Sequence, residues 1–185
     1  PIPPDFKRHV TTNNPTIDSI WQYINPMMLL NRHLGIKGST VKKLAATKNF
    51  SAIKQDLLKE DPKGVAIFEA VEEVKKIYRN SPLMEPRAVW RFFRCFSKGN
   101  QLHLGLKSDN GSHFSNEIIF DLPRQISGDK LCIADLSHPN PDQGDNIALF
   151  VVTVGRGVRE AAARLKDSGD YLKSHILQAL ALESA

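Results

Sequence analysis

Residues 87–107, RAVWRFFRCFSKGNQLHLGLK, mark the point where the hydrophobic pattern of the chain changes from a helical period to strict alternation. Residues 87–96 are rich in aromatic side chains, and residues 97–100 have the composition of a turn. The arm that follows, residues 101–107, has one apolar face: Leu102, Leu104 and Leu106. Its opposite face carries Gln101, His103 and Lys107. The segment therefore predicts a β-hairpin with one face toward solvent.

Three further strands are expected after the hairpin, at residues 117–121, 131–135 and 147–154, with a turn at residues 109–112. The last of these strands is apolar on both faces. Strands that are covered on both faces read as continuous hydrophobic runs. We therefore expect residues 147–154 at the centre of the sheet.

Helical patterns lie on both sides of this block of strands. One begins between residues 16 and 18, is interrupted at Pro26 and ends near residue 34, and a second covers residues 51–60. A third opens at Asp61-Pro62, a capping carboxylate followed by a proline suited to the first turn. Its apolar stripe is Ile67, Ala70, Val71, Val74, Ile77 and Tyr78. Two more helices are expected at residues 158–166 and from residue 169 onward. Helices segregated from antiparallel strands predict an α+β fold.

Length and composition limit the classes of protein that the chain can belong to. Its 185 residues are 41% hydrophobic and 24% charged, which indicates a globular domain and excludes a collagen or a coiled-coil rod. We interpret residues 1–15 as an extended linker and residues 16–185 as one module. No apolar run is long enough to span a membrane, and residues 1–8 lack a signal-peptide core, so no membrane partner is expected.

Charge and cysteine content indicate the kind of partner and the compartment to expect, but they do not indicate an activity. The net charge of +5 favours an acidic partner surface without requiring nucleic acid. Cys95 and Cys132 both stand inside apolar runs, which is typical of buried free thiols in a reducing compartment. We therefore expect a cytoplasmic protein.

Two local patterns are candidate functional sites, and each also has a simpler structural interpretation. Gly155-Arg156-Gly157, between a strand and a helix, suggests an anion site. The third glycine of a dinucleotide fingerprint is replaced by Glu160, which favours a tight turn. The loop from Asp135 to Asp145 gathers carboxylates and His138, but without a repeated ligand spacing it reads as a polar loop. His175 is expected to be packed or half-exposed in the last helix.

The hairpin segment also combines basic and aromatic residues, as platforms for single-stranded nucleic acid do. Its basic residues are Arg87, Arg91, Arg94, Lys98 and Lys107. Its rings are Trp90, Phe92, Phe93 and Phe96. Strand alternation divides these rings between the two faces, so we expect them in the core and expect no nucleic-acid partner.

Several short strings, taken in order, resemble one known family. They are YINP (23–26), HLGIKG (33–38), EPRAVWRFF (85–93), FDLPRQ (120–125), LCIAD (131–135), FVVT (150–153) and GDYLKSHILQALA (169–181). At these intervals they resemble the C-terminal activation domain of cobalamin-dependent methionine synthase. The resemblance covers residues 16–185 and implies a twisted antiparallel sheet flanked by helices.

The resemblance also implies a function. In that family the domain reactivates the enzyme after cob(I)alamin is oxidised to cob(II)alamin. It presents S-adenosylmethionine as methyl donor while flavodoxin or a related flavoprotein delivers an electron. The implied partners are therefore the cobalamin-binding domain of the same enzyme and a flavodoxin. Cobalamin and zinc are implied on other domains. The chain would be part of a methyltransferase, and we expect it not to be catalytic alone.

The resemblance implies only one ligand-binding residue within this chain, Asn25, which stands where the family has an aspartate. Asparagine keeps the acceptor oxygen but lacks the charge that attracts a sulfonium. A family glutamate would fall just past Ala185, and the family string Arg-x-x-x-Gly-Tyr-Pro does not occur. We therefore expect a module that is incomplete at its C-terminus, with little or no affinity for S-adenosylmethionine.

Two other functions remain as alternatives at this stage. The first is a stand-alone partner that reactivates a corrinoid protein without the other domains of the synthase. The second, from a different class, is a basic module that binds single-stranded nucleic acid through the hairpin at residues 87–107.

Overall fold

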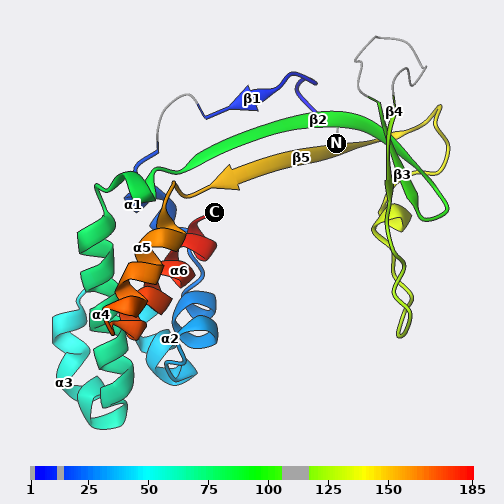
Figure 1. Cartoon of the computed structure of the whole chain (residues 1–185). Helices are drawn as coiled ribbons and strands as arrows, with labels where there is room; N and C mark the ends of the chain where they lie inside the picture. The colour runs from blue at the N-terminus through cyan, green and yellow to red at the C-terminus, as the bar shows by residue number, and fades with distance from the viewer. Residues whose placement is uncertain (1–2, 12–14, 106–116) are drawn as a thin grey trace. The chain divides into compact units, whose positions relative to one another are not determined.

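The computed structural model describes residues 3–11, 15–105 and 117–185, and these fall into two compact units (Figure 1). The strand unit comprises Pro1–Val10 and Ala88–Val151, and the helical unit comprises Thr11–Arg87 and Val152–Ala185. Leu106, Lys107 and the turn expected at residues 109–112 lie outside the described residues. Mixed helices and an antiparallel sheet confirm the expected α+β class.

The sheet of the strand unit has five strands in its described part. They are β1 (His9–Val10), β2 (Arg87–Lys98), β3 (Gln101–Gly105), β4 (Glu117–Asp121) and β5 (Asp145–Thr153). The path runs β1-β2-β3-β4, with β5 paired to β2. Antiparallel pairs place Cys95 opposite Leu104 and Leu102 opposite Phe120. The predicted hairpin is therefore confirmed as β2 and β3.

A small core holds the strand unit together. Cys95, Leu102 and Leu104 are buried, and Phe93, Leu122 and Ile147 pack against them. Both cysteines are buried and free, as expected, and burial raises the pKa of the Cys95 thiol.

His103 does not face solvent, contrary to the expectation from alternation. It is only 7% exposed, because its ring stacks on Phe96 at 4.6 Å between centroids. Its Nδ1 lies 3.0 Å from a carboxylate oxygen of Glu117 on the neighbouring strand. A cross-strand partner thus lets an imidazole occupy a buried position that the pattern alone assigns to water.

Two strand predictions are wrong. Within the described residues β5 pairs with β2 alone, so it lies at an edge of the sheet and not at its centre. Residues 131–135 form no strand, and a short 3-10 helix, η3 (Ile133–Leu136), stands there instead. Asp135 accepts the N–H of Cys132 at 3.3 Å, and such a local side-chain bond competes with strand pairing.

The helical unit contains six α-helices and two short irregular ones in its described part. They are α1 (Ile17–Trp21), η1 (Met27–His33), α2 (Gly38–Ala46), α3 (Phe50–Glu60), α4 (Pro62–Tyr78), η2 (Pro82–Met84), α5 (Val158–Asp167) and α6 (Tyr171–Ser184). Helix α2 was not expected from the sequence. None of the helices within the described ranges is long and apolar enough to cross a membrane.

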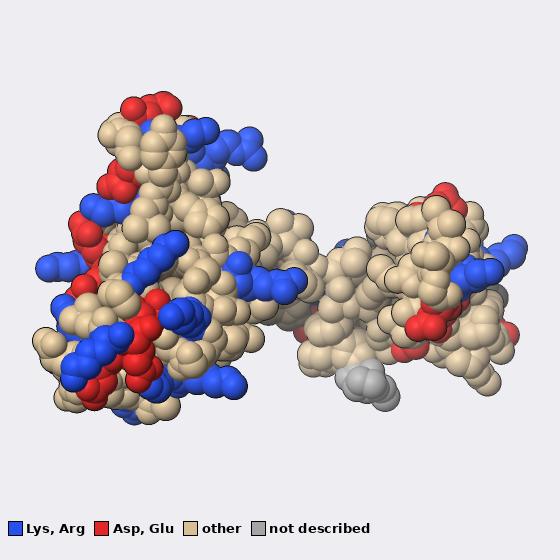
Figure 2. Space-filling model, turned by 90° about the horizontal axis from the view of Figure 1, so that it is seen from below, with Lys and Arg blue, Asp and Glu red and all other residues tan. Residues whose placement is uncertain are grey.

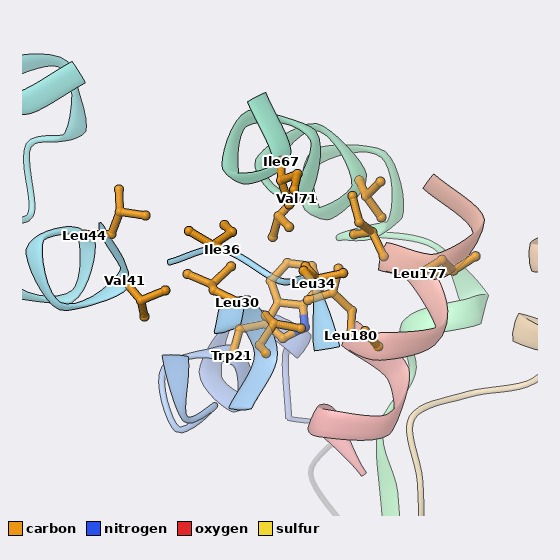
Figure 3. Close-up of a cluster of buried hydrophobic side chains, with 14 of the residues drawn as sticks. Trp21, Leu30, Leu34, Ile36, Val41, Leu44, Ile67, Val71, Leu177 and Leu180 are labelled. Carbon is orange, nitrogen blue, oxygen red and sulfur yellow. The ribbon is translucent and has the colours of Figure 1, made fainter. Parts of the chain in front are cut away.

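One apolar core joins these helices. Figure 3 shows side chains from α1, η1, α2, α4 and α6 converging on it, among them Trp21, Leu30 and Leu180. Helix α4 buries Ile67, Val71 and Val74, as its stripe predicts. Ile77, assigned to the same stripe, is 54% exposed, whereas the next residue, Tyr78, packs against the core.

A buried carboxylate fixes the start of α4. Asp61 Oδ1 accepts the N–H of Gly64 at 3.0 Å, and Oδ2 accepts the Thr40 hydroxyl of α2 at 2.9 Å. Burial acts to raise the pKa of this carboxyl, but the hydrogen bonds outweigh it and hold the pKa below its ordinary value of 3.8. A β-carbon at Gly64 would collide with the Asp61 carboxylate, so glycine is required there. The capping residue predicted at Asp61 is confirmed.

We expect Asp61→Ala to lower the free energy of unfolding by about 1–3 kcal/mol, because it removes the cap of α4 and leaves the Thr40 hydroxyl unpaired. Since the folded pKa is lowered, the ionised carboxylate stabilises the fold above pH 3.8, and this contribution is lost as pH falls through the folded pKa. Urea unfolding at neutral and acid pH measures both effects. Asp61→Asn should flatten the acid dependence. The control is Asp56→Ala on the exposed face of α3, and equal losses in the two alanine variants would contradict the prediction.

Candidate functional site

The break between α1 and η1 holds the one residue for which a ligand role is expected, Asn25. Helix α1 ends at Trp21, and η1 begins after Pro26. Asn25 Oδ1 accepts the N–H of Met27 at 2.9 Å, and its backbone oxygen accepts the N–H groups of Met28 and Leu29 at 3.0 and 3.1 Å. The exposed Asn25 side chain therefore caps η1 with its oxygen. Within the described residues its amide nitrogen makes no hydrogen bond.

The last turn of α6 anchors this break from a distant part of the sequence. The indole N–H of Trp21 donates to the Ser184 hydroxyl at 3.2 Å, and Nε2 of His33 lies 2.7 Å from a carboxylate oxygen of Glu183. His175, about two turns earlier on α6, has Nε2 2.9 Å from the backbone oxygen of His33. Asn25 is thus held between two segments that are each fastened to α6.

An apolar pocket of about 230 Å³ adjoins the break. Trp21, Ile24 and Pro26 line its side nearest Asn25, and residues of η1, α2 and α4 form the rest. Among its lining residues only Glu72 and Lys75 are charged; they form an ion pair of 3.0 Å, and the Lys75 ammonium lies 5.6 Å from the centre of a Trp21 ring. A pocket of this kind can accept a small apolar or aromatic group with polar atoms at its rim.

The glycine turn before α5 serves packing. Gly155 has φ +151 and its α-carbon lies so close to the Leu83 backbone that a β-carbon would collide with the Leu83 carbonyl. Gly157 has φ +84 and precedes the first residue of α5. Both positions require glycine for conformation or close approach, so the tight-turn interpretation is confirmed.

A salt bridge holds the start of the acidic loop that runs from Asp135 to Asp145. Arg124 donates to both carboxylate oxygens of Asp135, at 2.7 and 2.6 Å, and this pairing lowers the pKa of Asp135. His138 Nδ1 accepts the N–H of Asn140 at 3.1 Å. Among residues 3–11, 15–105 and 117–185 there is no group of three metal-ligating side chains. This geometry favours the polar-loop interpretation.

The aromatic residues of β2 are engaged within the molecule. Trp90 stacks on His9 with 5.3 Å between centroids, and Phe96 stacks on His103. The Arg91 guanidinium lies over Phe93 at 5.0 Å and donates to the Phe6 carbonyl at 2.8 Å. These rings are half-buried and do not form one open stacking surface.

The comparisons with known proteins agree with this architecture. The sequence model of the family described as "Vitamin B12 dependent methionine synthase, activation domain" matches residues 42–184. The chain belongs to this family.

A solved structure shares the fold at low sequence identity. Its title is "Crystal Structure of the MetH Reactivation Domain bound to AdoHcy", and it superposes with a TM-score of 0.63 at 18% identity. The match covers 97% of this chain and 52% of that chain, so this chain spans about half the length of its structural relative. A comparison with curated protein sequences gives no match.

Sequence reasoning located Asn25 but missed the contacts that hold it. The Trp21–Ser184 and His33–Glu183 pairs are 163 and 150 residues apart, and no local spacing indicates them. The apolar pocket was missed as well, since part of its wall comes from the unexpected helix α2.

Asn25→Ala should lower the free energy of unfolding by about 0.5–1 kcal/mol, because it removes the side-chain acceptor at the start of η1. Asn25→Asp keeps that acceptor and should retain the stability. Chemical denaturation measures the difference, with the exposed neighbour Gln22→Ala as the control. The capping role would be contradicted if Asn25→Ala and Gln22→Ala unfold at the same denaturant concentration.

Proposed function

We propose that this chain supports the reductive methylation of cob(II)alamin as part of cobalamin-dependent methionine synthase, with S-adenosylmethionine as methyl donor and a flavodoxin-type protein as electron donor. The observation that carries the proposal is membership of the activation-domain family over residues 42–184. The methyl group comes from the sulfonium of the donor and is accepted by cobalt on another domain, so both reacting atoms belong to bound cofactors. The task of this chain is to bind and orient.

Asn25 is the residue of this chain that we propose to contact the donor. The structural relative is described as bound to AdoHcy, the demethylated product. The Asn25 oxygen already accepts the Met27 N–H, which leaves the amide nitrogen to donate toward the solvent side. A donor of this kind suits a hydroxyl or carboxylate oxygen of the ligand. It adds no negative charge opposite the sulfonium, so the chain should discriminate weakly between the methylated and demethylated forms.

Restoring the charge tests this role directly. Asn25→Asp should raise the affinity for S-adenosylmethionine relative to AdoHcy by about three- to fivefold, because only the former carries the sulfonium charge and exposed charge pairs are worth less than about 1 kcal/mol. Because the affinity for either ligand is expected to be low, ligand-observed NMR titration with both ligands gives the ratio of the two Kd values. The matched control is Gln22→Glu, which adds the same charge three residues away. An unchanged ratio in Asn25→Asp, or an equal change in both variants, would remove Asn25 from the proposed site.

The positive charge of the chain is the basis for proposing an acidic flavodoxin-type protein as electron donor. The chain has a net charge of +5, and Lys98 and Arg94 are exposed on β2. On the face shown in Figure 2, Lys and Arg side chains lie among Asp and Glu side chains, so we expect a modest attraction, and we place it on the basic residues of β2. Complementary charge of this kind chiefly raises the rate of encounter with an acidic protein.

Association with a flavodoxin should therefore slow about tenfold between low and physiological salt, since exposed charges are screened over roughly 8 Å there. Stopped-flow measurement of flavin fluorescence at several salt concentrations records the association rate. Lys98→Glu should slow association at low salt. Lys59→Glu on α3, away from the basic residues of β2, should leave the rate unchanged. A rate independent of salt, or equal effects of the two charge reversals, would contradict this choice of surface.

A further inference from the structure

The apolar pocket beside α1 is formed by the helical unit alone, because every residue that lines it belongs to Thr11–Arg87. Figure 3 shows four of these residues, Trp21, Leu30, Leu44 and Val71, which come from α1, η1, α2 and α4. Each of the four is at most 9% exposed. The floor of the pocket is therefore apolar, and packed helices shield it from water.

The rim of the pocket reaches the surface. Pro26, Ala45 and Glu72 line the pocket and are exposed, so the cavity opens to solvent and is not a sealed packing defect. Its volume is about 230 Å³. An apolar cavity of about 150 Å³ stays dry when empty and can hold one benzene molecule. The pocket therefore has room for a single aromatic ring with a small substituent.

Two aromatic side chains in the wall, Trp21 and Phe68, favour an aromatic occupant. Aromatic rings attract each other in offset or edge-to-face arrangements, beyond the effect of the area that they bury. The leucine and valine side chains of the floor supply dispersion contacts to any apolar group that enters. An aromatic ring thus suits the pocket better than an aliphatic group of the same size.

The charges at the rim favour a neutral ligand. Lys75 donates to Glu72 at 3.0 Å, and its ammonium lies 5.6 Å from the centre of a Trp21 ring. Because these two charges are paired with each other, a charged ligand would lose its water in the pocket without meeting an opposite charge of its own. An ammonium has three N–H groups, so Lys75 can bind Glu72 and a ligand hydroxyl at the same time.

We propose that this pocket is a binding site for a neutral, single-ring aromatic molecule that carries a hydroxyl group. The ring packs against Trp21 and Phe68, and the hydroxyl lies at the rim, where it accepts a hydrogen bond from Lys75. This site is additional to the donor contact proposed at Asn25, which is not among the residues that line the pocket.

Benzyl alcohol is a suitable probe, and the chain contains its own control. Its two tryptophans are Trp21 in the pocket wall and Trp90 in the strand unit. In a proton–nitrogen correlation NMR titration of the full chain, the indole resonance of Trp21 should shift and saturate, while that of Trp90 stays in place. The absence of a saturable shift at Trp21, or equal shifts of the two resonances, would overturn the proposal.

Probes of similar size test the chemical class of the ligand. Benzoate and benzylammonium keep the ring but carry a charge, and both should bind about tenfold more weakly than benzyl alcohol. Cyclohexylmethanol keeps the hydroxyl but lacks the aromatic ring, and it should bind about threefold more weakly. Equal affinities for all four probes would contradict a site for a neutral aromatic molecule.

A pair of variants on α2 tests the location of the site. Ala45→Phe adds a ring at the rim of the pocket and should lower the affinity for benzyl alcohol at least about tenfold, because the two rings compete for the same space. The matched control is Ala46→Phe, at the next exposed alanine, which does not line this pocket and should bind like the parent chain. Circular dichroism establishes that both variants are folded, and equal affinities of the two would overturn the proposal.

Lys75→Met tests the contact with the hydroxyl, since methionine keeps an apolar stem and removes the ammonium. This variant should weaken the binding of benzyl alcohol about threefold and leave the binding of toluene, which has no hydroxyl, unchanged. The same titration of the Trp21 resonance measures both affinities. Equal losses for the two probes would contradict the assignment of the hydroxyl to Lys75.

Discussion

The helical unit depends on one buried carboxylate. Asp61 caps α4, the longest helix of the described chain, and at the same time binds the Thr40 hydroxyl of α2. Buried charges are tolerated only where hydrogen bonds replace water, and here two different helices provide them. The direction of α4 relative to α2 is thus set by a polar contact, and the apolar stripe of α4 then packs against η1 and α6. Gly64 is part of the same constraint, since any side chain there would displace the carboxylate.

Elements whose signals are local could be predicted from the sequence. Helix α4 has its cap, its proline and its stripe within one segment, and the hairpin of β2 and β3 has its turn between two alternating arms. Helix α2 was missed because its first turn lacks a side-chain cap and it buries only Thr40, Val41 and Leu44. The predicted position of β5 was wrong for another reason: an apolar composition is typical of a central strand, but it does not determine which strands pair with it.

At the candidate site, too, the local features could be predicted from the sequence and the long-range contacts could not. The break at Asn25–Pro26 was visible from the chemistry of proline, and the family resemblance identified Asn25. The anchoring of that break by Ser184 and Glu183 joins residues more than 100 positions apart and arises only when the chain is folded. An asparagine at this place combines a structural task for its oxygen with a free donor for its nitrogen. An aspartate could perform the first task but not the second.

The helical unit is built from two separated lengths of chain, with most of the sheet between them in the sequence. Residues from α5 and α6, including Ala161, Leu177 and Leu180, belong to the same buried core as those of α1 and α4. On the ribosome, the first four α-helices would therefore emerge well before the residues that complete their core. During that interval their apolar faces are exposed to other chains, so the core of this unit can be completed only after α6 has been synthesised.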